Sequence, residues 1–512
     1  MLINDMIERG AKQFANRTAI LFGDVTLTFA QVNDLANRLA NALGRLGVTP
    51  GRRVGLLINN GPYSVSMDFA CTKAGAIRVP LNPRLSVAEH TRMLAAMDVD
   101  LLIFGPDLVD RAQELEAALP RLQLLGLGAG ADDQNLLSLA ATESAQPPAH
   151  RPEPDDVVLA LYTSGTTGVL KAAEHTQASF AAVVLNILNN LVDPDESDVM
   201  LHAASMIHAS GTFVLPFWVR GGASAILPGF TPASYLHAIQ TWRPTVLNLV
   251  PTMIGMLLDH PGVQPAQFDS VQTLIYGASP MPAPLMNRAL DFFGLRLVQY
   301  YGQTEAPLAI ATLSKSDHRP EFAHRRLACG FPSVDCELRI LNADGEPALS
   351  GEPGEIAVRA PFLMKGYYGA PDLNAQHALP AGWLKTRDIG RLDEDGCLYL
   401  VDRQSEMIVS GGYNIYPKEV EDALLAHPEV REAAVVGLPD DKWGEAVTGF
   451  VVLRHPGVAS DQDLIAFVRE RLAAYKTPKA IRFIDEIPKS PVGKPMRRLL
   501  REPFWAGRER AI

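Results

Sequence analysis

The stretch Val157–Tyr162, VVLALY, runs directly into Thr163-Ser164-Gly165-Thr166-Thr167-Gly168-Val169-Leu170-Lys171. The apolar run predicts a buried β-strand, and the hydroxyls and glycines predict a loop at its end. Glycines let the backbone approach an anion, hydroxyls add hydrogen-bond donors, and the lysine adds a positive charge. We therefore interpret residues 163–171 as a phosphate-holding loop. The spacing is not that of a Walker A loop, and a polar surface loop is the alternative.

Helix-like and strand-like segments alternate on both sides of this loop. Before it come a helical pattern at 35–46, a strand at 53–58, a helix at 63–76 and a strand at 76–81. After it, 224–227 and 246–250 resemble strands, and 282–293 resembles a helix. This alternation predicts an α/β fold with a largely parallel sheet.

The pattern changes twice toward the C-terminus. Tighter alternation at 336–360 predicts a small antiparallel β region. Beyond Arg403, the segments 418–426 and 461–472 are helical, and 430–437 and 480–483 are strand-like. We expect an N-terminal domain at 1–403 and a smaller α+β domain at 404–512.

Composition excludes several classes of protein. Of the 512 residues, 47% are hydrophobic and 20% are charged, which excludes a disordered or fibrous chain. With 46 basic and 57 acidic residues the net charge is −11, so no basic excess favours a nucleic-acid partner. The apolar segment at 180–191 is short and interrupted by asparagines, so we expect a buried helix and no transmembrane segment.

The cysteines and the N-terminus indicate the compartment. Cys71, Cys329, Cys336 and Cys397 form no CxxC pair and accompany no histidine cluster, which argues against a disulfide scaffold or a zinc site. The first residues, MLINDMIERGAKQF, lack the basic and apolar regions of a secretory signal. We therefore expect a cytoplasmic protein.

Three further clusters carry chemical groups. In 299–305, QYYGQTE, an aromatic ring could stack on a base, and a threonine and carboxylate could hold a phosphate oxygen and Mg²⁺. A strand end with two core tyrosines is the alternative. Asp388, in 383–390 (WLKTRDIG), could take both hydroxyls of a ribose, or could be a turn carboxylate. Lys494, in 488–495 (PKSPVGKP), could be catalytic or merely a solvated charge.

In this order and spacing the clusters resemble the adenylate-forming superfamily, in particular the AMP-dependent acyl-CoA synthetases and carboxylate–CoA ligases. The resemblance runs from 27–29 (LTF) through 71–76 (CTKAGA) and 80–83 (PLNP) to 411–421 (GGYNIYPKEVE) and Lys494. It implies that ATP and an acid give an acyl-adenylate and pyrophosphate, after which a thiol takes the acyl group. It thus implies ATP, Mg²⁺ and coenzyme A (CoA) as cofactors.

The resemblance implies a nucleotide site. Tyr301 would stack on adenine, and Asp388 would bind the ribose hydroxyls with support from Arg403. The remaining nucleotide-binding residues would be Thr163, Ser164, Gly165, Thr166, Thr167, Gly168, Lys171, Gly277, Ala278, Ser279, Tyr300, Gly302 and Gln303.

It also implies a catalytic set. Thr304 would bind the α-phosphate, and Glu305 would hold Mg²⁺ together with Thr167. Lys494 would bridge the carboxylate and α-phosphate oxygens in the first step, because a positive charge there neutralises the charge that develops at phosphorus. His208 resembles the aromatic gate residue of acyl- and aryl-CoA ligases, with a core histidine as the alternative.

In enzymes of this superfamily the C-terminal domain rotates between the two steps. A glycine-rich strand, here Ser410-Gly411-Gly412-Tyr413, then lines the tunnel for CoA. The hinge position is Ser405, where an aspartate or lysine is usual. Other departures are Leu170, Ala172 and Gln177, and Arg387, which places a bulky cation where glycine is common.

The choice of acid is expected to depend on one pocket. A histidine at 208 is a poor partner for an ammonium group, which argues against an amino acid. The pocket residues would include small ones that leave room for an aryl acid or a medium- or long-chain fatty acid, and 171–173 with Gln177 resembles the aryl ligases slightly more. They are His208, Ala209, Ser210, Gly211, Tyr276, Ala278, Tyr300 and Pro307.

The acceptor is expected to be a separate molecule. The few residues after Lys494 cannot form a carrier domain, so free CoA is the default acceptor. The alternative is an adenylating enzyme that delivers to a separate carrier protein or an amine. A catalytically idle nucleotide-binding protein is disfavoured, because such a protein would need none of the charged residues that this chain has together. These are Lys171, Glu305, Asp388, Arg403 and Lys494. The oligomeric state stays open, with a homodimer as one option.

Overall fold

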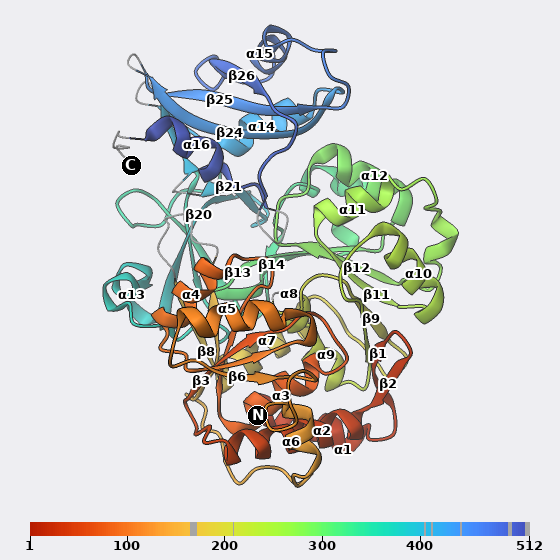
Figure 1. The fold of residues 1–512 in the computed structure, drawn as a ribbon. Coiled ribbons are helices and arrows are strands. Elements are labelled where there is room, and N and C mark those ends of the chain that lie inside the picture. Colours follow the sequence, from red (N-terminus) through yellow and green to blue (C-terminus); the bar gives the residue numbers. More distant parts are fainter. Residues whose placement is uncertain are drawn as a thin grey trace.

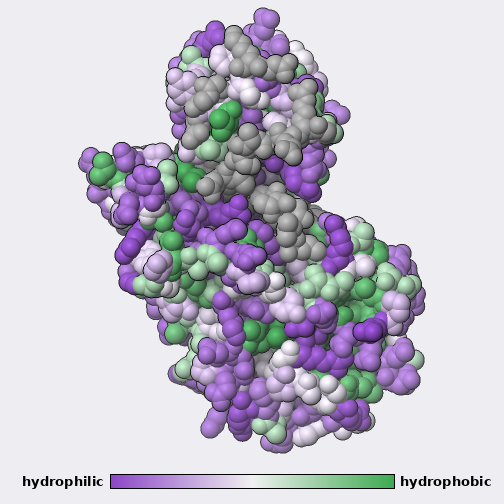
Figure 2. All heavy atoms as spheres, turned by 90° about the vertical axis from the view of Figure 1, so that its left-hand side faces the viewer, coloured by the Kyte–Doolittle hydropathy of each residue, from purple (hydrophilic) through white to green (hydrophobic). Residues whose placement is uncertain are grey.

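The computed structural model of the chain describes residues 1–163, 171–207, 209–403, 406–410, 413–440, 443–489 and 494–506. Figure 1 shows a large body that holds the N-terminus and a smaller C-terminal unit above it. Figure 2 shows that polar residues cover much of one face of both parts, with scattered apolar residues between them. Within the described ranges, every helix is too short or too polar to span a bilayer.

One sheet of the body is built around the strand that precedes the phosphate loop. From β7 to β6 its strands are parallel, and β8 and β18 add antiparallel pairs at one edge. Its order is β18 (Gly366–Tyr367), β8 (Ala172–Thr176), β7 (Val157–Tyr162), β4 (Ile77–Pro80), β3 (Arg53–Leu57), β5 (Leu101–Phe104) and β6 (Gln123–Gly126).

A second sheet carries the tyrosine cluster. Its interior strands are parallel, which confirms the α/β prediction, and antiparallel strands close both edges. Its order is β15 (Phe331–Pro332), β14 (Ala306–Leu313), β13 (Leu297–Gln303), β12 (Thr273–Gly277), β11 (Val246–Leu249), β9 (Val199–His202), β10 (Ala223–Ile226), β1 (Thr18–Phe22) and β2 (Val25–Thr28).

Helices connect and cover these strands. Helix α2 begins at Phe29, earlier than the apolar spacing predicts, because Thr28 and Gln31 form a capping box. The expected buried helix is α7, which Thr176 and Ser179 cap in the same way. The helices of the body are α1 (Ile3–Gln13), α2 (Phe29–Arg45), α3 (Ser64–Ala74), α4 (Val87–Ala96), α5 (Val109–Ala118), α6 (Leu136–Ala141), α7 (Gln177–Asn190), α8 (Ala209–Thr212), α9 (Val214–Trp218), α10 (Pro232–Trp242), α11 (Pro251–Leu258), α12 (Ala283–Phe293) and α13 (Pro371–His377).

The predicted antiparallel region forms a third, smaller sheet. Its strands are β16 (Glu337–Leu341), β17 (Gly354–Arg359), β20 (Trp383–Leu392), β19 (Ala378–Leu379) and β21 (Leu398–Arg403). All of its pairs are antiparallel, as the tight alternation predicts. Strand β21 leads toward the C-terminal unit in Figure 1.

The C-terminal unit has its own sheet and core. Its sheet contains β22 (Ile408–Ser410), β23 (Tyr413–Ile415), β24 (Val430–Asp440), β25 (Gly444–Leu453) and β26 (Ala480–Phe483). Its helices are α14 (Pro417–Leu425), α15 (Asp461–Arg469) and α16 (Arg497–Trp505). Buried residues such as Ile408, Leu424 and Val447 pack into one cluster there, which is consistent with an independent folding unit.

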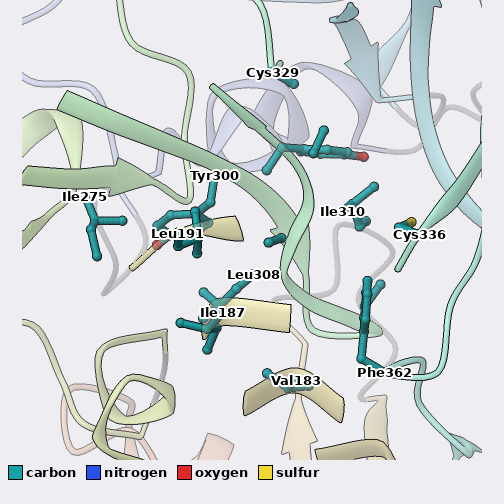
Figure 3. Packing of buried hydrophobic residues seen from close by; sticks show 14 of the residues in the cluster. Val183, Ile187, Leu191, Ile275, Tyr300, Leu308, Ile310, Cys329, Cys336 and Phe362 are labelled. Atoms are coloured by element: carbon teal, nitrogen blue, oxygen red, sulfur yellow. The ribbon is translucent and has the colours of Figure 1, made fainter. Parts of the chain in front are cut away.

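The core of the body reaches the tyrosine cluster. Figure 3 shows side chains of α7 facing Tyr300 and Leu308 of the second sheet, with Cys336 and Phe362 at the other side of the cluster. The four cysteines are free thiols, and all of them are buried. The site described below therefore stands on a closely packed support.

Candidate functional site

The two adjacent tyrosines of β13 are both buried, but they contact different groups. Successive side chains of a strand point to opposite faces, and Tyr300 lies against Phe213, with ring centroids 6.3 Å apart. The hydroxyl of Tyr301 donates to Oδ2 of Asp388 at 2.7 Å. Burial and then the Asp388 charge raise the pKa of Tyr301 well above its usual value. The predicted adenine and ribose residues are thus in direct contact.

A bulge in β20 directs Asp388 to this contact. Thr386, Arg387 and Asp388 oppose only Ile356 of β17, because the pairs on either side are Lys385 with Ala357 and Ile389 with Glu355. Thr386 Oγ1 donates to the Ile356 carbonyl at 2.8 Å and accepts from the Asp388 N–H at 3.1 Å. Arg387 takes a φ of 63°, which is left-handed. The sequence Thr-Arg-Asp therefore forms a β-bulge that the hydrogen bonds of Thr386 hold in place.

Two glycines of the predicted nucleotide site have steric reasons to be glycine. A Cβ at Gly302 would lie 2.2 Å from the carbonyl oxygen of Leu308, and a Cβ at Gly277 would lie 2.5 Å from that of Tyr300. Both obstacles are backbone atoms, which cannot rotate away. Leu308 itself has a φ of 61°. The close approach of backbones at this edge of the second sheet requires glycine at both positions.

The predicted phosphate loop joins two antiparallel strands, β7 and β8. The Thr163 N–H donates to the Lys171 carbonyl at 2.9 Å, which closes the base of the loop. Ser164, Gly165, Thr166, Thr167 and Gly168 lie outside the described residues. Lys171 Nζ stands 5.8 Å from the ring centroid of Tyr367. The loop therefore ends beside Tyr367.

Tyr367 of β18 joins the lysine to the carboxylate that follows the tyrosines. Its hydroxyl donates to Oε1 of Glu305, and its ring also meets that of His377 at 5.4 Å. Burial lowers the pKa of Lys171, the charge of Arg387 lowers it further, and Glu305 opposes both. Tyr367 was not predicted from the sequence. Its only signal was a Gly-Tyr-Tyr stretch, of which just the first two residues form the strand.

A buried histidine holds the turn between β13 and β14. Because a carbonyl only accepts, His175 Nε2 carries the proton and donates to the Thr304 carbonyl at 2.8 Å. Burial lowers the pKa of His175 to about 4, so the ring is neutral at pH 7. Nδ1 has no hydrogen-bond partner among the described residues. His175 was also missed, since a lone histidine in a strand gives no signal of this role.

The surroundings of Glu305 suit Mg²⁺ bound together with a nucleotide. In the part of the chain that the structure describes, no group of three or more His, Cys, Asp or Glu side chains could hold a metal alone. Mg²⁺ usually takes only one or two protein carboxylates and completes its shell with phosphates and water. A half-buried carboxylate beside Lys171 fits that pattern, and Thr167 lies outside the described residues.

The predicted acyl pocket is only partly described. His208 lies outside the described residues, while Ala209 opens α8 and Gly211 abuts the Met206 carbonyl. Ser210 is buried, with Oγ 3.0 Å from Nδ1 of His202. The Tyr276 hydroxyl is bound in the core, 2.8 Å from Gln299 and 2.9 Å from His318. Ala278 and Pro307 of this pocket are half-buried, as are Ser279, Gln303 and Thr304 of the predicted nucleotide site and catalytic set.

The remaining predicted residues lie in the C-terminal unit or in strand β21, which precedes it. Arg403 pairs in register with Asp388 across β20 and β21. Ser410 is buried, and Tyr413 is exposed and stacks on Tyr475 at 4.7 Å. Lys494 precedes Pro495, which forms an isolated antiparallel β-bridge with Lys489. Ser405, Gly411 and Gly412 lie outside the described residues.

Comparisons with known proteins point the same way. Residues 7–368 match the family model of the AMP-binding enzyme, and residues 419–494 match that of the AMP-binding enzyme C-terminal domain. The chain is 38% identical over 500 residues to a feruloyl-CoA synthase of Amycolatopsis sp., covering 97% of this chain and 98% of the relative. It is 35% identical over 518 residues to the medium/long-chain-fatty-acid–CoA ligase FadD8 of Mycobacterium tuberculosis, covering 98% and 90%.

A solved structure is also similar over nearly the whole chain. The amide bond synthetase McbA from Marinactinospora thermotolerans aligns with a TM-score of 0.89 at 30% identity, covering 98% of this chain and 99% of that one.

Proposed function

Because the chain belongs to the AMP-binding enzyme family, we propose that the cluster around Tyr301, Asp388 and Lys171 is its nucleotide site. The protein is an AMP-forming acid–CoA ligase, which uses ATP, Mg²⁺ and CoA to make an acyl-CoA through an acyl-adenylate. One observation supports the site above all. Segments far apart in sequence bring a ribose-type carboxylate, an aromatic ring, a metal-type carboxylate and a lysine together.

The contacts support a role for each group. Asp388 accepts from Tyr301 through Oδ2, so its carboxylate is already oriented for two neighbouring hydroxyls. Lys171 neutralises the charge of the terminal phosphates, and Glu305 holds Mg²⁺, which offsets the charge of ATP. Thr304 binds the α-phosphate, and the hydrogen bond from His175 to its carbonyl holds the backbone in place for that role.

The adenylation step needs a cation between the two reacting anions. The carboxylate oxygen attacks the α-phosphorus, the bond to the β-phosphate breaks, and pyrophosphate leaves with the electron pair. We assign that cation to Lys494, carried by a C-terminal unit of residues 404–512 that moves against residues 1–403. In the second step Ser410 and Tyr413 flank the approach of CoA.

The substrate class is an aryl acid or a medium- or long-chain fatty acid. The two curated relatives above act on one kind each. The small residues Ala209, Gly211 and Ala278 support a pocket with room for either. We also propose a cytoplasmic location, which the free thiols support.

A second function has one observation in its favour. The similarity to McbA extends over nearly the whole chain, and that enzyme is an amide bond synthetase. The alternative is therefore an adenylating enzyme whose acyl group passes to an amine or to a separate carrier protein.

Pyrophosphate release distinguishes the two. The purified enzyme is given Mg-ATP with benzoates, phenylpropenoates and C4–C16 fatty acids, with and without CoA. We expect one class of acid to drive release that accelerates with CoA, with isolation of the acyl-CoA. Slow single-turnover release that is indifferent to CoA would move the assignment to the amine or carrier acceptor.

A further inference from the structure

Arg387 occupies a backbone position that suits glycine better. Its φ of 63° lies in the left-handed region, which disfavours any residue that has a Cβ. Such outliers persist where the surrounding structure holds them, and they are frequent at active sites. Thr386 provides that hold through its two hydrogen bonds. The chain therefore keeps a large cation where glycine would be more stable.

Three other cations of the third sheet have partners. Arg359 contacts Glu337 at 2.6 Å, and Lys385 lies 3.5 Å from Glu355. Arg339 stands 4.0 Å over the ring of Trp383. Among the described residues, Arg387 has no ion pair, hydrogen bond or aromatic partner of this kind, although it is half-buried. Its guanidinium thus has donors that the described protein does not use.

The neighbours of Arg387 define which side of the nucleotide it faces. The next residue, Asp388, contacts Tyr301. On the other side its charge acts on Lys171 and on His377, both of which contact the ring of Tyr367. Two cations, Lys171 and Arg387, therefore repel each other, and the carboxylate of Glu305 offsets this repulsion at Lys171. An anion between them would remove that repulsion.

We propose that Arg387 is a second polyphosphate-binding residue of the nucleotide site, which holds the β- or γ-phosphate of ATP and the pyrophosphate leaving group beside Lys171. The inference rests on the proposed nucleotide site. A guanidinium can donate two parallel hydrogen bonds to a phosphate, whereas an ammonium acts as a point charge. Arg387 thus adds directional contacts to the charge that Lys171 supplies.

The test separates the backbone effect from the charge effect. Arg387→Gly removes the cation and relaxes the backbone. Ala381→Gly relaxes a similar φ of 60° at an exposed position of the same region without changing the charge. Arg387→Lys keeps the charge but loses the planar fork. The Kd of ATP, of AMP and of magnesium pyrophosphate is measured by calorimetry, with the thermal midpoint of each variant.

We expect Arg387→Gly to weaken ATP and pyrophosphate about tenfold, as for a lost hydrogen bond to a charged group, and to leave AMP within about twofold. Its thermal midpoint should rise, as should that of Ala381→Gly, which binds all three ligands normally. Arg387→Lys should lie between. Unchanged ATP and pyrophosphate affinity would overturn the proposal, and so would an equal loss for AMP, which would indicate a displaced Asp388. If the wild-type enzyme bound no nucleotide, the nucleotide site itself would fail.

Discussion

The buried histidine behind the β13–β14 turn should make the stability of this enzyme depend on pH. Burial lowers the pKa of His175 from 6.5 to about 4. At a pH between these two pKa values, His175 is protonated in the unfolded chain but neutral in the native protein. Falling pH therefore favours unfolding. The loss begins below pH 6.5 and is complete below about pH 4, where it amounts to roughly 3 kcal/mol. About 2 kcal/mol of it should be lost between about pH 7 and 4.5.

His175→Gln isolates this effect. The glutamine amide can still donate to the Thr304 carbonyl, as Nε2 of the histidine does at 2.8 Å, but it does not titrate. Urea unfolding followed by tryptophan fluorescence is compared at the two pH values for wild type, for His175→Gln and for the exposed control His237→Gln. We expect the wild type and the control to lose about 2 kcal/mol more than His175→Gln on acidification. Equal losses in all three proteins would refute the reasoning.

Three further predictions concern the site itself. Lys494→Ala should slow adenylation by a factor of roughly 10²–10³ yet largely spare thioester formation from a supplied acyl-adenylate. The control Lys489→Ala should affect neither half-reaction. Equal loss in both half-reactions of Lys494→Ala would contradict the assignment. Gly302→Ala should lower the thermal midpoint and abolish activity, because its Cβ would lie 2.2 Å from a carbonyl oxygen. Gly44→Ala, whose Cβ would enter open space, should be neutral or stabilising. A stable, active Gly302→Ala enzyme would refute the packing argument. Tyr301→Phe should raise the KM for ATP about tenfold by removing a hydrogen bond to a buried carboxylate, and an unchanged KM would show that this bond does not orient it.

The fold was largely predictable because its signals are local. Apolar runs gave β7 within its observed bounds, and helical spacing gave α12 to within one residue. The start of α2 was placed too late because the capping pair at Thr28 and Gln31 precedes the apolar pattern. Local capping chemistry, rather than hydrophobic spacing, determines that boundary.

The site was predictable as a list of residues but not as an arrangement. The contact of Tyr301 with Asp388 spans 87 positions, and no spacing in the sequence indicates it. The left-handed φ of Arg387 depends on the Thr386 bulge and its pairing with β17, which is tertiary information. Tyr367 was missed because a two-residue strand has no periodicity to detect.

The four buried thiols have a consequence for how this enzyme handles its own intermediate. An acyl-adenylate acylates any thiolate within reach, including one of the enzyme. Burial raises the pKa of Cys71, Cys329, Cys336 and Cys397 to about 12. At pH 7 only about one such thiol in 10⁵ is ionised, and the thiolate is the nucleophile. The protein thus presents no competing sulfur, and the mixed anhydride is kept for the external acceptor instead of being lost to self-acylation.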